Sequence, residues 1–174
     1  VLKALFQKLL RLFTLILKEK VFPEMTIFVS LTTIHSRISS IHNVIQSLLD
    51  NKLPDHITDD INICLFVSKN PFLVDAGITS IPASLDNISQ KLSNTSSQFN
   101  LIIKFVPNLG PHRKYIFNTL DDEDIMITVD DDTVYPNDFL SRMITSLDYF
   151  NCVVAMRGRK IRFGNFGISP YNQW

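Results

Sequence analysis

Three consecutive carboxylates, Asp130, Asp131 and Asp132, are the residues whose type and spacing most clearly predict chemistry in this sequence. They directly follow the apolar residues 125–129, a run typical of a buried strand. Two unit charges about 4 Å apart repel by roughly 4 kcal/mol at an effective dielectric constant of 20. A hard divalent cation such as Mg²⁺ or Mn²⁺ removes this repulsion and prefers oxygen ligands. We therefore predict an open metal site completed by water and phosphate oxygens, with a solvated acidic turn as the alternative.

Apolar runs and amphipathic stretches alternate along the chain and predict the elements that position these carboxylates. Strands are predicted over residues 25–32, 61–67, 101–106, 125–129 and 152–156, and helices over residues 38–51, 81–92, 111–120 and 137–150. This alternation is typical of an α/β fold with a mainly parallel sheet flanked by helices. Ligands bind beyond the carboxyl ends of the strands in such sheets, so functional side chains are expected directly after each apolar run.

Three segments in this order resemble those of GT-A-fold glycosyltransferases, most closely the bacterial family 2-like group. Residues 128–136 (TVDDDTVYP) resemble the Asp-x-Asp segment of these enzymes. Residues 29–37 (VSLTTIHSR) resemble the first-strand loop that wraps the nucleotide, and residues 108–114 (NLGPHRK) resemble the Gly-Pro-x-x-Lys turn before the Asp-x-Asp strand. The resemblance covers about residues 25–174 and implies a Rossmann-like fold that binds nucleotide-diphospho-sugars.

The resemblance also implies roles for the carboxylates. Asp132 matches the last aspartate, which binds the metal that bridges the donor diphosphate, and Asp130 is a second metal-ligand candidate. Asp130 and Asp131 match the positions that hold the ribose or the donor sugar. Mn²⁺ or Mg²⁺ is therefore the expected cofactor. Metal and basic side chains together neutralise a diphosphate as it leaves.

Five other residues are implied to bind the nucleotide-sugar. Thr33 and Arg37 match the nucleotide-binding loop, and Lys114 matches a cation near the base or the phosphates. Several GT-A enzymes hold uracil with an acidic residue after the second strand. This sequence has Ser68 and Asn70 there, so one of them is expected to take that role.

The implied reaction moves a sugar from a metal-bound nucleotide-diphosphate sugar, with UDP-sugar the expected donor, to a saccharide or lipid-linked acceptor, with inversion. The catalytic base of such enzymes comes from the acceptor half, and no acidic residue follows Asp148. We therefore expect the base beyond Trp174. One alternative is a nucleotide-sugar-binding module without catalysis. Another is a phosphatase of the haloacid-dehalogenase type, whose nucleophile motif fits Asp130-x-Asp132 but stands near the chain start in that class.

Amino-acid composition, net charge and the cysteine and histidine residues limit the class of protein and its partners. The chain has 174 residues, of which 45% are hydrophobic and 20% charged, as in globular domains. Its 17 Lys and Arg residues balance 17 Asp and Glu residues, which gives no reason to expect a nucleic-acid partner. Cys64 and Cys152 each stand in an apolar run, and both are predicted to be buried free thiols, consistent with a cytoplasmic protein. The histidines share no metal-ligand spacing.

Residues 1–20 predict a separate amphipathic, basic helix that precedes a donor-binding domain over residues 21–174. Charged residues interrupt its apolar run, so it is not expected to span a bilayer; these are Lys3, Lys8, Arg11 and Lys18. One interpretation is a helix lying on the inner face of the membrane. The other is a helix packed on its own domain or on a second copy of the chain.

Overall fold

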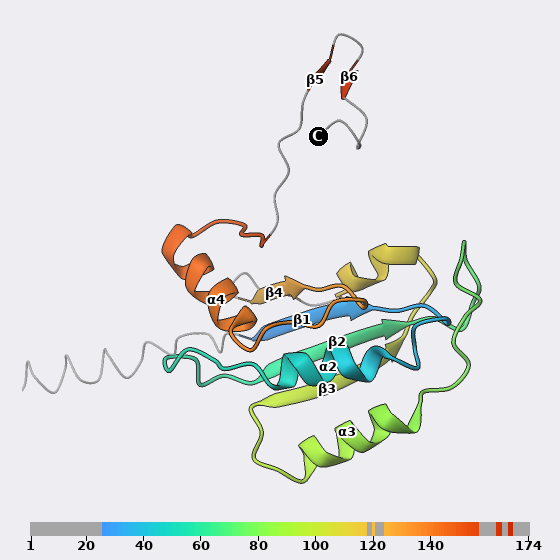
Figure 1. Ribbon diagram of the computed structural model, residues 1–174, viewed down its shortest axis with the longest axis horizontal. Helices are drawn as coiled ribbons and strands as arrows, with labels where there is room; N and C mark the ends of the chain where they lie inside the picture. Colours follow the sequence, from blue (N-terminus) through green and yellow to red (C-terminus); the bar gives the residue numbers. More distant parts are fainter. Residues whose placement is uncertain (1–25, 118–119, 121–123, 157–162, 165–166, 169–174) are drawn as a thin grey trace, which may run out of the picture. The chain divides into compact units, whose positions relative to one another are not determined.

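The computed structural model describes residues 26–117, 120, 124–156, 163–164 and 167–168 (Figure 1). The chain forms two compact units. The sheet unit comprises the described residues of 1–46 and 58–134, and the second unit comprises those of 47–57 and 135–174. The helix predicted over residues 1–20 lies outside the described residues. Within the part of the chain that the structure describes, no helix combines the length and apolar character needed to cross a bilayer.

The sheet unit is built on four parallel strands in the order β3-β2-β1-β4 (Figure 1). They are β1 (Ile27–Thr32), β2 (Ile61–Val67), β3 (Phe99–Phe105) and β4 (Ile125–Thr128). Ile27 of β1 is in register with Ile61 of β2 and with Ile125 of β4. The predicted α/β fold with a mainly parallel sheet is confirmed, and each of these strands lies within two residues of its predicted bounds.

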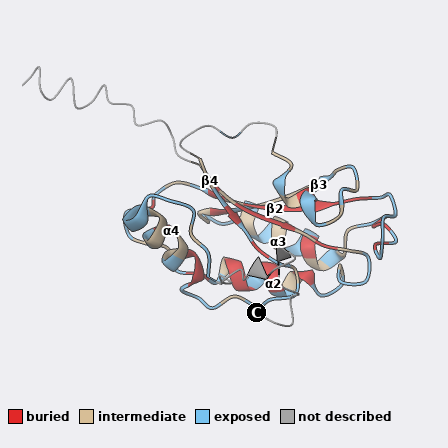
Figure 2. Ribbon diagram, turned by 90° about the horizontal axis from the view of Figure 1, so that it is seen from above, coloured by how far each residue is buried: buried red, intermediate tan, exposed pale blue. Residues whose placement is uncertain are grey.

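The helical segments lie on both faces of the sheet, because the chain crosses the sheet first in one direction and then in the other. Parallel crossovers are right-handed. The steps from β1 to β2 and from β2 to β3 run one way and place α2 (Ile41–Leu49) and α3 (Ala83–Ser93) on one face (Figure 2). The step from β3 to β4 runs back, so the 3₁₀ helix η1 (Gly110–Tyr115) contacts β1 and β2 from the other face.

Apolar side chains fill both faces of the sheet. Val29, Leu31 and Ile63 are fully buried on one face. On the other face the Phe117 ring, just after η1, packs on Phe28 and Phe66 with ring centroids 5.2 and 5.3 Å apart. Burial on both faces explains why the strands read as continuous apolar runs.

The helices differ from their predicted bounds for local reasons. Residues 35–40 form turns, with the Arg37 and Ile38 amides donating to the Ile34 carbonyl at 3.0 and 3.1 Å, so α2 starts at Ile41 rather than at residue 38. Pro82 is extended, with ψ 143°, and α3 starts after it. The helix predicted over residues 111–120 is the shorter 3₁₀ segment η1, whose first residue, Gly110, has φ 58°.

The second unit contains the end of α2, helix α4 (Phe139–Phe150) and the short antiparallel strands β5 (Phe163–Gly164) and β6 (Gly167–Ile168). Asn51 organises it, because its side-chain oxygen accepts a 2.8 Å hydrogen bond from the Leu140 amide near the start of α4. The side chains of Phe139, Leu140 and Ile144 are buried.

The strand predicted over residues 152–156 is wrong. None of these residues joins a sheet in the described structure, and the Val153 side chain is 97% exposed. Cys152 is also exposed, contrary to its predicted burial, whereas Cys64 is buried as predicted. A short apolar segment forms a strand only where it can pair with the edge of a sheet and pack against a core. The local sequence pattern does not show whether such an edge is available.

Candidate functional site

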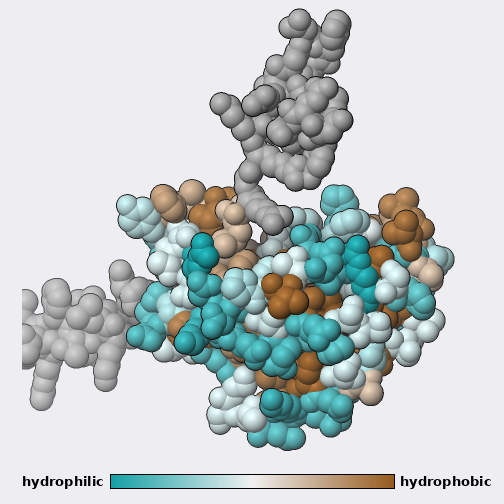
Figure 3. Space-filling view, in the orientation of Figure 1, coloured by the Kyte–Doolittle hydropathy of each residue, from teal (hydrophilic) through white to brown (hydrophobic). Residues whose placement is uncertain are grey.

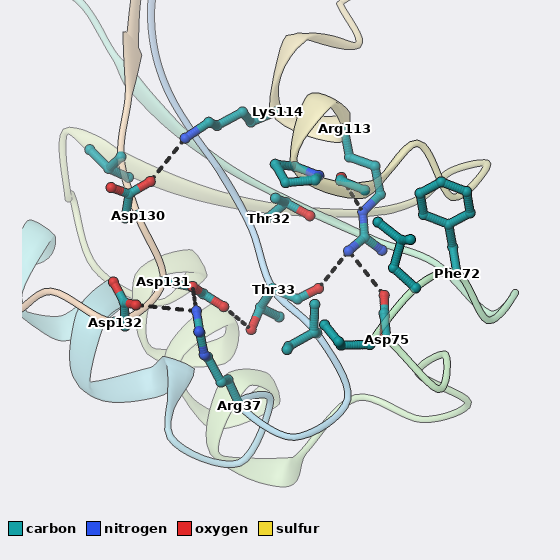
Figure 4. Close-up of a pocket in the computed structure, with 16 residues that line it drawn as sticks. Thr32, Thr33, Arg37, Phe72, Asp75, Arg113, Lys114, Asp130, Asp131 and Asp132 are labelled. Carbon is teal, nitrogen blue, oxygen red and sulfur yellow. Dashed lines mark hydrogen bonds and ion pairs between the residues drawn. The ribbon is translucent and has the colours of Figure 1, made fainter. Parts of the chain in front are cut away.

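A pocket of about 310 Å³ opens at the carboxyl ends of β1 and β4 (Figure 4). The strand order reverses between these two strands, because the chain proceeds to β2 and β3 on one side of β1 and returns to β4 on the other. Parallel α/β sheets bind ligands in the crevice at this switch point. The pocket wall comes from the segments after β1, β2 and β4 and from η1; its polar side chains include Thr33, Arg37, Asp75, Arg113, Lys114, Asp130, Asp131 and Asp132.

Arg37 joins two of the three consecutive carboxylates. Its Nη1 atom lies 2.6 Å from Asp131 Oδ1 and 3.3 Å from Asp132 Oδ2. The Thr33 hydroxyl donates a 2.7 Å hydrogen bond to the other oxygen of Asp131. The hydrogen bond to Asp131, reinforced by the charge of all three aspartates, raises the pKa of Arg37. The charge of the aspartate triplet is therefore partly compensated within the protein.

Lys114 compensates the first aspartate. Its Nζ atom lies 3.0 Å from Asp130 Oδ1. The Ser30 hydroxyl on β1 donates to the backbone carbonyl of Lys114 and so ties η1 to the strand. Arg37 and Lys114 thus approach the aspartates from the segments after β1 and in η1, and three segments distant in sequence form one charged rim.

The aspartates fit an open cation site rather than a closed cage. Asp130 and Asp132 are 70% and 58% exposed, so a hydrated cation can reach their oxygens from solvent. Among the described residues no three His, Cys, Asp or Glu side chains converge as a complete ligand set. Mg²⁺ and Mn²⁺ sites commonly use one or two carboxylates together with water and phosphate oxygens. Asp132 and Asp130 are the residues that would hold such an ion here.

A second Asp–Arg pair lies inside the pocket wall (Figure 4). Arg113 and Asp75 are 1% and 3% exposed, and Arg113 Nη2 lies 3.0 Å from Asp75 Oδ2. The same guanidinium donates from Nη2 to the Thr33 carbonyl at 2.9 Å and from Nε to the Gly110 carbonyl at 3.1 Å. Its Nη1 atom is buried and has no hydrogen-bond acceptor among the described residues.

Asp75 is held by several donors at once. Oδ1 accepts from the backbone amides of His35 and Gly77 at 3.0 and 3.1 Å, and Oδ2 accepts from Asn108 Nδ2 at 3.2 Å as well as from Arg113. Burial alone would raise the pKa of Asp75. The hydrogen bonds and the Arg113 charge outweigh burial and lower it.

A glycine makes this arrangement possible. Gly77 has φ 85°, and a Cβ atom there would lie 2.2 Å from the Lys69 carbonyl oxygen. Any other residue would therefore push the loop open. Asp75 and Arg113 were not among the predicted site residues. The spacing Asp75-Ala76-Gly77 is the one available signal, since an aspartate that accepts from the amide two residues later is typical of a turn.

Six predicted site residues meet in this pocket: Thr33, Arg37, Lys114, Asp130, Asp131 and Asp132. Ser68 and Asn70 lie outside its lining. The Ser68 hydroxyl accepts from the Asn70 amide at 3.2 Å, and the Asn70 carbonyl accepts from Asn108 Nδ2 at 2.6 Å. These groups tie the loop after β2 to the turn that precedes η1.

An apolar lip borders the pocket beside Arg113. Phe72 and Asp75 exchange backbone hydrogen bonds of 2.9 and 3.0 Å across a tight turn. At the tip of this turn Leu73 and Val74 are 83% and 85% exposed, and Leu73 adopts φ 53°. Hydrophobic surface is visible in this part of the molecule at the right of Figure 3. The pocket therefore has a charged rim and an apolar lip.

Comparison with known proteins gives no match, either to a family model or to a curated protein. The functional assignment consequently depends on the geometry of this pocket and on the three short segments that resemble GT-A enzymes.

Proposed function

We propose that this chain carries the donor-binding half of a metal-dependent glycosyltransferase of the GT-A type. The observation that supports this most is the collection of Asp130, Asp131 and Asp132 with Arg37 and Lys114 around one pocket at the switch point of a parallel sheet. A pocket at this place in an α/β sheet is a usual position for a nucleotide. Its rim carries both oxygen ligands for a cation and cations for phosphates.

In the proposed complex Arg37 and Lys114 turn from the aspartates toward the diphosphate of the sugar donor. Both are close enough to the rim to exchange one anionic partner for another. Asp132, with Asp130, holds the divalent cation, and Asp131 stays fixed by Thr33. A bound Mg²⁺ or Mn²⁺ neutralises charge on the departing nucleoside diphosphate. The side chains of Arg37 and Lys114 add to that neutralisation.

The proposed acceptor is a saccharide or a lipid-linked saccharide, and the proposed donor is a UDP-sugar. The carboxylates that line the pocket are Asp75, Asp130, Asp131 and Asp132. Asp75 is paired with Arg113, Asp131 is held by Thr33, and Asp130 and Asp132 are assigned to the cation, so none is a good candidate for the base that activates the acceptor. This observation favours a base supplied from outside the described pocket. It equally favours the second candidate, a nucleotide-sugar-binding module without catalysis.

Calorimetry with UDP tests the proposal. We expect UDP to bind in Mn²⁺ and to bind much more weakly in EDTA, because the aspartates repel a diphosphate that arrives without the cation. Equal affinity in the two buffers would contradict the proposal. Transfer or hydrolysis of a UDP-sugar then separates the enzyme from the binding module.

We also propose that residues 1–20 hold the protein at the inner surface of the membrane. Their basic amphipathic pattern suits an anionic lipid surface, where a lipid-linked acceptor would be found. Flotation with anionic vesicles, with and without residues 1–20, tests this. A full chain that stays unbound and is a dimer, which truncation converts to a monomer, would favour self-association instead.

A further inference from the structure

One buried nitrogen of the Arg113 guanidinium has no hydrogen-bond acceptor in the part of the chain that the structure describes. The guanidinium is fixed by Asp75, Thr33 and Gly110, yet Nη1 has no acceptor among the described residues. A buried donor without a partner is destabilising and uncommon in native proteins. In Figure 4 the Arg113 side chain reaches into the space between Thr33 and the turn that carries Phe72 and Asp75. An oxygen of a bound ligand would satisfy this donor.

The charge around Arg113 selects a neutral acceptor. Asp75 already compensates the guanidinium at 3.0 Å, and both side chains are almost fully buried. A phosphate placed there would be buried with a net negative charge, which is costly. The exposed rim of Arg37, Lys114 and the aspartates suits a diphosphate and its cation better. A carbonyl oxygen is an uncharged hydrogen-bond acceptor, so it suits the end of the pocket where Asp75 already compensates the charge of Arg113.

The lip beside Arg113 suits a flat, apolar group. Phe72, Leu73 and Val74 line this end of the pocket together with Pro111. Nucleobases bind proteins through apolar and aromatic faces while polar groups contact their edges. A nucleotide whose phosphates meet the charged rim would thus bring its base to the apolar lip.

The edge that Arg113 presents to a base is a donor edge. Asp75 accepts four hydrogen bonds, which fill the lone pairs of its two oxygens, so it has no capacity left for an N–H of the ligand. We infer that Arg113 Nη1 donates to a carbonyl oxygen of the nucleobase, so that the pocket selects bases carrying a carbonyl, such as uracil, over adenine. This inference depends on the proposed nucleotide-binding function.

Nη1 is buried, so access to it would require the exposed tip of the turn, Leu73 and Val74, to move outward while Asp75 keeps its hydrogen bonds. The turn is suited to such a shift, because its tip residues are exposed and Leu73 has a backbone conformation that non-glycine residues seldom adopt. At the exocyclic position where uracil or hypoxanthine carries a carbonyl oxygen, adenine carries an amino group, which would face the Arg113 donor. Two donors facing each other leave both unpaired, and sites built for one hydrogen-bonding edge reject analogues that lack it.

Changes to the ligand test the inference without disturbing the protein fold. Calorimetry in Mn²⁺ compares UDP, ADP, IDP, 2-thio-UDP and 4-thio-UDP. IDP differs from ADP in carrying a carbonyl in place of the amino group, and each thio analogue replaces one carbonyl oxygen by a weaker acceptor. We expect ADP to bind about tenfold more weakly than UDP and IDP, and one thio analogue to lose a similar factor.

The outcomes separate this inference from the proposed function. If all five nucleotides bind with the same affinity, Arg113 does not bind a base carbonyl and the inference is overturned, while the nucleotide-binding function stands. If none of them binds in Mn²⁺, both are overturned. If IDP binds as weakly as ADP and neither thio substitution matters, an ordered water satisfies Nη1 and the inference falls.

A protein variant adds an independent test. Arg113→Lys keeps a positive charge beside Asp75 but removes the second donor nitrogen. We expect UDP affinity to fall about tenfold, to the level of ADP, with ADP affinity unchanged. Arg142→Lys is the matched control: it makes the same change in an exposed pair between Arg142 of α4 and Asp138, which directly precedes the helix, and should leave the preference for UDP intact. A preference for UDP over ADP that persists in Arg113→Lys would overturn the inference, and the ligand series decides it if this variant does not fold.

Discussion

The pocket contains two Asp–Arg arrangements that differ mainly in exposure. On the rim, Arg37 contacts Asp131 and Asp132 where solvent reaches both the guanidinium and Asp132. In the wall, Arg113 and Asp75 are sealed from solvent and surrounded by further hydrogen bonds. Exposed ion pairs contribute little to stability because water replaces either partner readily. A buried pair cannot lose one partner without leaving a buried charge uncompensated. The exposed Asp–Arg contacts on the rim can therefore be exchanged for a ligand, whereas the buried Asp75–Arg113 pair keeps the shape of the pocket wall.

Removal of the buried carboxylate should give the largest effect. Asp75→Asn leaves the Arg113 charge without its counter-ion, so we expect the free energy of unfolding to fall by about 3–5 kcal/mol. Urea denaturation measures this. Asp132→Asn is the matched change on the rim and should alter stability by less than about 1 kcal/mol. Equal stability of Asp75→Asn and the wild type would show that the buried pair does not maintain the wall.

On the rim, substitution of Asp132 should change UDP binding more than it changes stability. Asp132→Asn removes a carboxylate from the proposed cation site, and we expect UDP affinity in Mn²⁺ to fall about 100-fold. Calorimetry provides the measurement. Asp138→Asn, at the start of α4 and outside the pocket lining, serves as the control. Wild-type affinity in Asp132→Asn would remove this residue from the metal site.

Loss of either rim cation should have a smaller effect. Arg37→Ala and Lys114→Ala each remove one charge-assisted contact to the diphosphate, so UDP binding should weaken by about 1–3 kcal/mol. Calorimetry and thermal denaturation are compared for each variant. Lys91→Ala, at the exposed end of α3, controls for loss of positive charge. A lower melting temperature with unchanged affinity would instead give these residues a structural role.

The smallest expected effect is a pH dependence of the buried pair. The pKa of Asp75 is lower in the folded chain than its ordinary value of about 3.9. The stability contributed by its ionised form is therefore fully present above that ordinary value and is lost as pH falls through the folded value. The difference in unfolding free energy between wild type and Asp75→Asn should be constant from about pH 5 to 7 and shrink below about pH 4. A difference that grows as the solution is acidified would contradict the assigned direction.

The sheet and the rim followed from the sequence because both leave local patterns. Burial on both faces makes each strand a continuous apolar run, and residues 61–67 were predicted with the bounds that β2 has. The rim follows from topology, since parallel strands bring the ends of β1 and β4 together. The resemblance to GT-A enzymes assigns Thr33, Arg37 and Asp131 to one site, and the pairing of β1 with β4 explains why these residues meet.

The buried pair could not be predicted in the same way. Arg113 and Lys114 are adjacent basic residues in η1, and nothing in the local pattern indicates which of them turns inward. The partner of Arg113 lies 38 positions away in a loop whose path depends on Gly77 and Asn108. The apolar run at residues 152–156 failed for the opposite reason, since its pattern indicates a strand but no described strand pairs with it.

Cys64 is buried in the sheet and Cys152 is exposed, so thiol modification can be used to follow opening of the sheet. Burial raises the pKa of the Cys64 thiol, in the middle of β2, to about 11, so at neutral pH it stays protonated as well as shielded. Cys152 is exposed. Because the thiolate is the reactive form, a mild disulfide reagent should modify one thiol per native molecule at once. The second thiol, that of Cys64, then reacts only in molecules whose β2 has separated from its neighbours, so its modification rate reports how readily the sheet opens.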